Sequence, residues 1–296
     1  MGLTEVVRKL DAYSIHGHLN PGGQDEELVD YEEFFAEVAS RAVGVSFRVG
    51  SNLVALVESG SRQGRHGLRL ASGDPAGQAE VFDPATGTAA EVSLGREQLL
   101  VSPAWVIVDP IARIAVVEKR RPGVPVMEIE RFLSIYGRER LGMPGLTLSL
   151  NPVPSPSFRR EIETFTRIRE AAVVLRRPNH SFTSDAREML GQIAEASNAQ
   201  DVEVQVNAAR GGTLSKDSGI VADILSFVKS AINPLLNARV VGNRPDFEGE
   251  RSVSLNKHTV RGSARIETNS PADEQLNALD EAAQGLIEQA QDAGDE

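Results

Sequence analysis

The chain has 296 residues, 41% of them hydrophobic and 25% charged, which is enough for one large or two ordinary folded domains with apolar cores. It contains no cysteine, and this excludes disulfides, thiolate nucleophiles and zinc sites built on Cys. The formal net charge is −11, and the chain shows no secretory signal and no bilayer-spanning apolar run, so we expect a cytoplasmic protein.

The first part of the chain is rich in strand signals. Residues 12–18 alternate in a way that predicts a strand, and 30–40 have helical spacing with Phe34, Phe35 and Val38 on the inner side. Further short strands, separated by Gly, Asp and Pro turns, are predicted at 53–57, 67–70, 91–94, 105–108 and 114–117.

After Pro125 the hydrophobic period becomes helical. A helix is predicted over 126–141, with Ile129, Leu133 and Tyr136 on one side. Strands then alternate with helices. The strands are predicted at 146–150, 171–175, 202–206, 239–241, 252–255 and 259–266. The helices are predicted at 156–168, after Ser184, at 218–231 and at 273–290.

This order of elements predicts an α+β fold in three parts. Residues 1–144 are expected to form a β-rich N-terminal domain, and 145–271 an α/β domain with basic strands. Residues 272–296 are expected to form an acidic C-terminal helix or tail, since they hold eight carboxylates and no Lys or Arg. Without them the chain has 34 acidic and 31 basic residues, and such a near-neutral body can carry a basic face.

No catalytic motif is present, so the sequence predicts no catalytic residue, no cofactor and no metal ligand. His16 and His18 share one side of a predicted strand, where two half-exposed histidines are a more ordinary interpretation than a metal site. A metal-dependent nuclease is the alternative from another class of function, in place of a binding protein. It would use Asp109 and the adjacent pair Glu118-Lys119, although adjacent strand residues point to opposite faces.

A Gly-rich loop over 207–216 follows one predicted strand and precedes a helix. Paired glycines can turn backbone amides inward, and a helix N-terminus adds partial positive charge, so the loop could bind an anion. Arg210 and Lys216 would add full charges. The competing interpretation is an ordinary strand-to-helix turn.

The segment 239–265 is the strongest candidate for binding phosphates, because it holds six cationic residues against three acidic ones. These cations are Arg239, Arg244, Arg251, Lys257, Arg261 and Arg265. The last three are spaced by four, so on a strand they would share one face and could follow a phosphate backbone. The competing interpretation is scattered surface charge.

Three blocks of the sequence resemble the RexA-like phage exclusion proteins and their relatives in bacterial antiphage systems. The first block runs from Pro103-Ala104-Trp105 through Asp109-Pro110 to Val124-Pro125. The second runs from Phe158 to the sequence Arg176-Arg177-Pro178-Asn179, and the third is the Gly-rich loop at 210–213. The resemblance spans roughly residues 10 to 266.

The resemblance implies a prophage-encoded cytoplasmic homodimer that binds double-stranded DNA with little sequence preference. It also implies a membrane-embedded partner encoded alongside, through which infection is aborted. The family has no agreed catalytic residues, so none are transferred to this chain. A protein-interaction adaptor whose acidic tail docks a basic partner is the third alternative, beside DNA binding and the nuclease.

Overall fold

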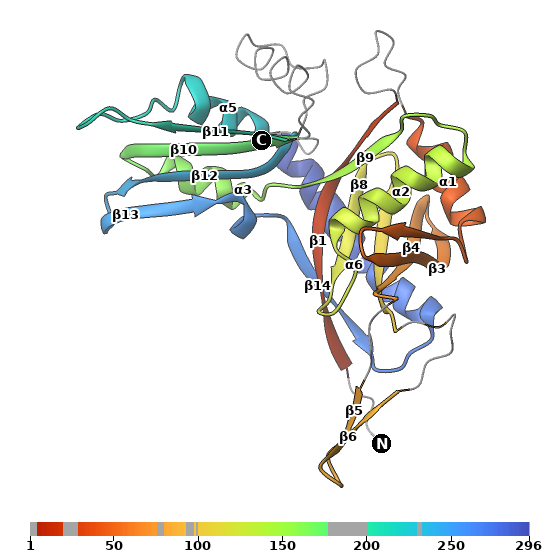
Figure 1. Cartoon of the computed structure of the whole chain (residues 1–296). Coiled ribbons are helices and arrows are strands. Elements are labelled where there is room, and N and C mark those ends of the chain that lie inside the picture. Colours follow the sequence, from red (N-terminus) through yellow and green to blue (C-terminus); the bar gives the residue numbers. More distant parts are fainter. Residues whose placement is uncertain are drawn as a thin grey trace.

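The computed structural model describes residues 5–19, 29–75, 80–92, 98, 100–176, 201–229 and 233–295. The fold is α+β, as predicted. Two antiparallel sheets make up most of the described chain, and each is packed against helices (Figure 1). We call each sheet together with its helices a unit. In Figure 1 a small hairpin projects from the larger unit. The helix predicted after Ser184 lies outside the described residues.

The larger sheet has eight strands in the order β14-β1-β8-β7-β4-β3-β2, with β9 also paired to β1. Their bounds are β1 Glu5–His18, β2 Ser46–Val49, β3 Asn52–Arg62, β4 Arg65–Gly73, β7 Ser102–Asp109, β8 Ile114–Lys119, β9 Thr147–Pro152 and β14 Arg261–Glu267. Strand β1 is long enough to pair with β14 and β8 along its first part and with β9 along its last part. Segments from both ends of the chain therefore meet in one sheet.

Helices α1 (Tyr31–Arg41) and α2 (Val126–Arg140) cover one face of this sheet. Helix α1 begins where predicted because the Asp30 carboxylate accepts a hydrogen bond from the Glu33 amide at 3.0 Å. Phe34, Phe35 and Val38 are buried, which confirms the predicted inner side. The predicted inner residues of α2 are buried as well.

Buried polar side chains hold α2 in place. The Glu130 carboxylate accepts a hydrogen bond from the Leu150 amide at 2.6 Å, and the Ser134 hydroxyl accepts one from the Leu148 amide at 2.8 Å. Both amides belong to β9, so the helix completes hydrogen bonds that this strand does not make with a neighbour. These contacts fix α2 beside β9.

Helix α6 (Ala272–Asp295) covers the opposite face of the larger sheet. Leu279 is fully buried there, and Leu276 lies so close to Gly67 that a Cβ on this glycine would be 2.2 Å from the leucine side chain. The buried Arg65 side chain forms two hydrogen bonds of 2.8 Å with the Asp280 carboxylate. The predicted acidic tail is therefore a packed helix, whose apolar side is part of the core.

The smaller sheet has four strands in the order β11-β10-β12-β13. Their bounds are β10 Arg167–Arg176, β11 Asp201–Asn207, β12 Leu235–Arg244 and β13 Phe247–Ser254. Helices α3 (Pro156–Glu163) and α5 (Gly219–Val228) pack on one face around Phe158, Ile162 and Ile224. The helix predicted over 156–168 ends at Glu163, and Ile168 is buried as a residue of β10 instead.

The arrangement of the sheets differs from the predicted division at 144 and 271. Strands β9 and β14 both pair with β1, so each belongs to the larger sheet although it lies in the predicted second domain. The smaller sheet is an insertion between them. The hairpin of β5 (Glu80–Asp83) and β6 (Thr88–Glu91) projects away from the larger unit (Figure 1).

Candidate nucleic-acid interface

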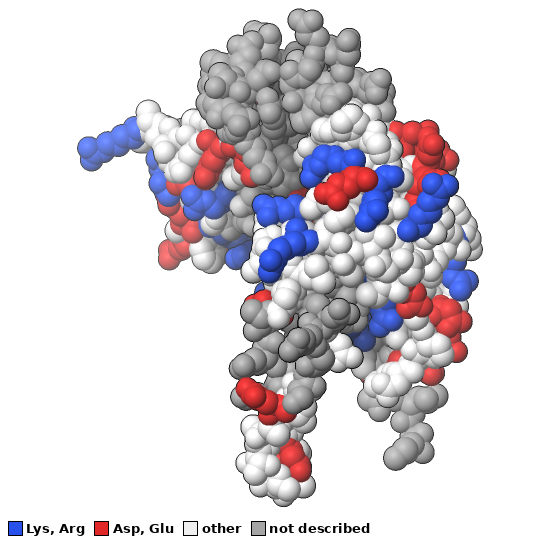
Figure 2. All heavy atoms as spheres, turned by 45° about the vertical axis from the view of Figure 1, so that its right-hand side comes forward, with Lys and Arg blue, Asp and Glu red and all other residues white. Residues whose placement is uncertain are grey.

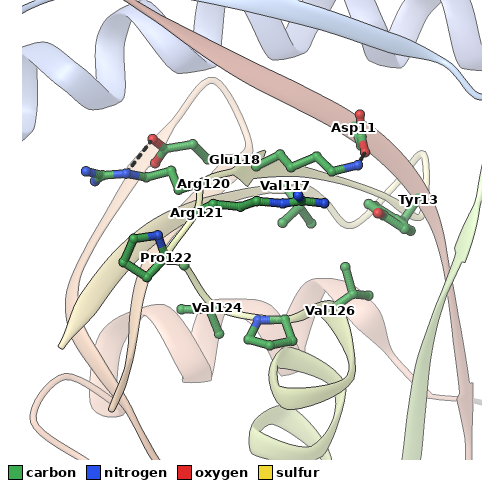
Figure 3. Close-up of a pocket in the computed structure, with 12 residues that line it drawn as sticks. Asp11, Tyr13, Val117, Glu118, Arg120, Arg121, Pro122, Val124 and Val126 are labelled. Carbon is green, nitrogen blue, oxygen red and sulfur yellow. Dashed lines mark hydrogen bonds and ion pairs between the residues drawn. The ribbon is translucent and has the colours of Figure 1, made fainter.

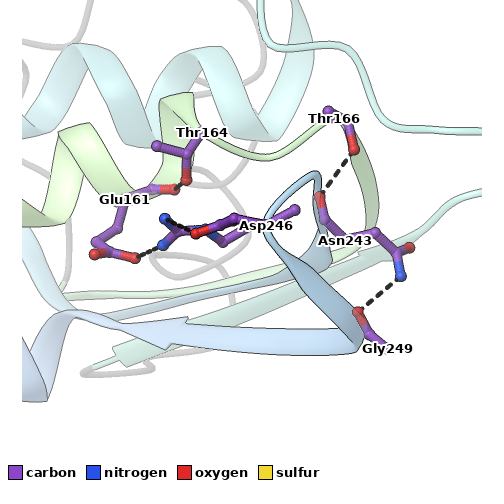
Figure 4. A network of polar contacts seen from close by, with 7 residues as sticks. Glu161, Thr164, Thr166, Asn243, Asp246 and Gly249 are labelled. Carbon is purple, nitrogen blue, oxygen red and sulfur yellow. Dashed lines mark hydrogen bonds and ion pairs between the residues drawn. The ribbon is translucent and has the colours of Figure 1, made fainter.

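The structure divides the predicted basic segment between the two sheets. Within the smaller unit, Arg239 is ion-paired with Glu170, and Arg251 stacks over the Phe247 ring at 5.8 Å. The Arg244 side chain forms ion pairs with Glu161 and Asp246, which are the two acidic residues labelled in Figure 4. The distance from Arg244 Nε to Asp246 Oδ1 is 3.0 Å, and this contact lowers the pKa of the Asp246 carboxyl. These three arginines are held by contacts within the chain.

Lys257 does not share a strand with Arg261 and Arg265, contrary to the prediction from their spacing. It lies in a short 3-10 helix, η1 (Leu255–Lys257), and the chain turns again before β14 begins at Arg261. The turn is closed by a hydrogen bond of 2.8 Å from the His258 amide to the Leu255 carbonyl. Only Arg261 and Arg265 lie on one strand face.

The hydrogen bonds of the Gly-rich loop favour the ordinary turn over the anion site. The Gly212 amide donates to a carbonyl within the loop and the Leu214 amide donates to β10, both at 2.8 Å, so neither points to a ligand. The following helix, α5, begins only at Gly219. The Lys216 ammonium group donates to a backbone carbonyl of α3 at 2.7 Å, whereas Arg210 is exposed. The loop is an ordinary connection with one exposed arginine.

A different set of cations comes together on the larger sheet. On the side that carries α1 and α2, but beyond the area that the helices cover, the register places Lys9 opposite both Lys119 and Ser263. Arg261 and Arg265 flank Ser263 on the same face of β14, which is exposed at every second residue. We call the surface formed by these cations the basic face, which consists of Lys9, Lys119, Arg121, Arg261 and Arg265. Figure 2, which brings the right-hand side of Figure 1 forward, shows Lys and Arg side chains on the upper half of the body, on the side where Figure 1 places α1 and α2.

One buried carboxylate lies among these cations. Asp11 is 2.9 Å from the Lys119 ammonium group and 3.4 Å from the Arg261 guanidinium group, so it holds both side chains in place. Arg265 is 79% exposed and only reaches Glu5 at 4.0 Å. Within the part of the chain that the structure describes, Lys9 and Arg121 form no ion pair. The basic face therefore keeps a positive charge.

A pocket of about 350 Å³ adjoins the basic face at the N-terminus of α2 (Figure 3). Its polar lining includes Asp11, Tyr13, Lys119 and Arg121, and Val124 contributes to its apolar side. Burial, and then the negative charge of Asp11, raise the pKa of Tyr13 to about 12. The phenol is therefore protonated at neutral pH. Arg120 and Glu118 complete the charged lining, so three cations outnumber two carboxylates there, and this balance suits an anionic group such as a phosphate.

Sequence reasoning missed Lys9, Lys119 and Arg121 as members of one site. Lys9 and Lys119 are more than a hundred residues apart, and only the pairing of β1 with β8 makes them neighbours. One indication of this site was present in the sequence, because Lys119 lies at the end of a strand and Arg121 follows it. Such a position predicts exposure but not which other strand lies alongside.

The residues of the nuclease alternative do not form a metal site. Asp109 accepts a hydrogen bond of 2.8 Å from the Ala112 amide, within the turn between β7 and β8. Glu118 is 3% exposed, accepts from the Trp105 amide at 3.1 Å and pairs with Arg8 at 3.2 Å, near the other end of β8. Among the described residues, no group of three His, Asp or Glu side chains could hold a metal ion.

The chain matches no family model, and a search of curated proteins finds no significant relative. Of the helices in the described part of the chain, none is both long and apolar enough to cross a membrane.

Proposed function

We propose that the protein binds double-stranded DNA without sequence preference, through the phosphate backbone, at the basic face. The observation that supports this most strongly is the alignment of Lys9, Lys119, Arg261 and Arg265 on one side of three adjacent strands. Arg121 extends the row toward the pocket. Arg239, Arg244 and Arg251, which the number of cations in the segment 239–265 favoured, are left out because they belong to the other sheet.

The geometry suits backbone contacts better than base reading. Residues two apart on a strand are about 7 Å apart, and neighbouring strands are about 5 Å apart, so these spacings set the separation of the cations on the exposed face. Each phosphate contact releases counterions, and binding should therefore depend on salt and not on sequence.

The proposed biological setting is phage exclusion by a cytoplasmic, prophage-encoded homodimer that signals to a membrane-embedded partner. Its support is the RexA-like order of sequence blocks. DNA binding at the basic face would supply the sensing step in that setting. The acidic helix does not mask the basic face in the manner of a tail, because α6 lies on the opposite side of the sheet.

The test is a gel shift at several salt concentrations with the variant Lys9→Glu/Arg265→Glu. We expect weaker binding to every DNA sequence, and a log–log salt slope that is shallower by about 2, since each lost phosphate contact removes about 0.9. The matched control is Arg160→Glu/Arg210→Glu, which makes the same charge change at exposed residues of the smaller unit and should bind like the wild type.

Equal weakening in both variants would show that only net charge matters, and would contradict the assignment of the site. A wild-type protein that does not shift DNA at low salt would contradict the function and favour the adaptor alternative. Incubating plasmid with the protein and Mg²⁺ distinguishes this proposal from the nuclease alternative. The proposal predicts that the plasmid stays intact, whereas a nuclease would degrade it.

A further inference from the structure

Strand β14 is an open edge of the larger sheet. It pairs with β1 over seven residues without a register shift, and no other strand of the described chain pairs with its outer side. The strand contains neither proline nor a bulge, which are two of the features with which proteins block such edges. Unpaired backbone groups along a regular edge can accept a further strand.

The sequence of β14 restricts how a second copy could pair with it. We consider an antiparallel pair of β14 strands related by a two-fold axis perpendicular to the sheet. Residues that lie directly opposite each other then project from the same face of the sheet. The axis must therefore pass between one residue and the same residue of the second copy, and we say that the pair is centred on that residue. Centring on Ser263 would oppose Arg261 to Arg265, and centring on Arg265 would oppose that arginine to itself. Like charges directly opposite each other destabilise a strand pair, which disfavours both registers.

Centring on Ala264 gives complementary neighbours along the whole strand. Arg261 then faces Glu267 of the second copy, and the two-fold axis repeats this pair. On the α6 side, Gly262 faces Ile266 of the second copy, a small residue against a large one. Ser263 faces Arg265, so no two cations are directly opposed.

The other sheet edges offer less for self-pairing. Strand β2 has only four residues, and the pairing of β13 with β12 shifts register near its start. Strand β11, centred on its middle residue Val204, would oppose Glu203 to Gln205 and would form no ion pair. Strands β5 and β6 have four residues each, and β9 ends at Pro152, so among these edges β14 best combines length, regularity and self-complementary charge.

We infer that two copies of this chain form a homodimer by antiparallel pairing of β14 with β14, centred on Ala264. The two larger sheets become one continuous sheet, with both α6 helices on one side and both basic faces on the other. The inference rests on the homodimer of the proposed function and gives it an interface. DNA backbone could then cross the two-fold axis along a surface twice as long as that of one copy.

Light scattering without DNA tests the interface. We expect wild-type protein at micromolar concentration to have about twice the monomer mass of 31.9 kDa. Glu267→Arg opposes two arginines at both ends of the strand pair, and should raise the dimer dissociation constant at least tenfold. Glu248→Arg, the same change on the edge strand β13, is the matched control and should leave the dimer unchanged.

Cysteine cross-linking tests the register, because the chain has no cysteine of its own. An oxidised mixture of Ser263→Cys and Arg265→Cys chains should give far more covalent dimer than either variant alone, since these positions face each other only in the proposed register. A wild-type dimer that Glu267→Arg leaves intact, with no preference for the mixed cross-link, overturns the interface while the homodimer stands. A wild-type monomer overturns both, and the gel shift still decides DNA binding independently.

Discussion

The two sheets use charged residues in different ways. In the larger sheet, which helices cover on both faces, charged side chains are buried in pairs, as with Arg65 and Asp280, or extend from strands beyond the helices. In the smaller unit, arginines such as Arg159 of α3 and Arg244 of β12 pair with carboxylates that are themselves partly exposed. The smaller sheet was the expected basic unit, yet the larger one carries the more open basic surface. The number of cations in a segment therefore says little about which of them can meet a ligand.

The largest effect should come from breaking the buried pair beneath α6. Arg65 and Asp280 are each 10% exposed, so Arg65→Met leaves a buried carboxylate without its partner. We expect the free energy of unfolding, measured in urea, to fall by about 4 kcal/mol. The exposed neighbour Arg62→Met is the control and should change it by less than about 0.5 kcal/mol. Equal effects would mean that α6 is not docked as described.

A slightly smaller effect should separate the two units. Ile162 is fully buried between α3 and the smaller sheet, and Ile162→Ala should cost about 3 kcal/mol. We expect faster hydrogen exchange in α5 and β10 but not in α6, because the cores around Ile162 and beneath α6 are distinct. Uniformly faster exchange would show that the two sheets unfold as one unit.

The next effect in size should appear at alkaline pH, where the titration of Tyr13 reports on the pocket beside the basic face. The folded protein holds the phenol proton more tightly than the unfolded chain does, so stability is lost as pH rises from about 10 to about 12. Absorbance of the phenolate should show one tyrosine that titrates near pH 12 and disappears in Tyr13→Phe. An ordinary pKa for this tyrosine would mean that the pocket is open to water.

The smallest effect should come from a surface pair in the smaller unit. Arg159 Nε lies 2.8 Å from Glu163 Oε1, with the side chains 32% and 47% exposed. We expect Glu163→Gln to reduce the free energy of unfolding by no more than about 0.5 kcal/mol, and by less at high salt. A loss comparable to that of Arg65→Met would remove the contrast between buried and exposed pairs.

The sequence predicted local structure well and the site poorly. Helix α1, the hairpin of β7 and β8 and the inner side of α2 follow from hydrophobic spacing, because neighbouring residues determine them. The basic face depends on which strands lie side by side, and no local signal predicts that Lys9 meets Lys119. Spacing by four also failed for Lys257, because it assumes an unbroken strand and the chain turns at His258.

The pairing of β1 with β14 has a consequence for synthesis. Strand β1 acquires this neighbour only after about 250 further residues have been synthesised, so the larger sheet stays incomplete until β14 has left the ribosome. The smaller sheet, whose strands lie closer together in sequence, can form earlier. Until β14 and α6 arrive, the nascent chain exposes one side of β1 and the apolar surface that α6 later covers. A ribosome stalled shortly before residue 261 should therefore hold a chain that chaperones bind and proteases cut.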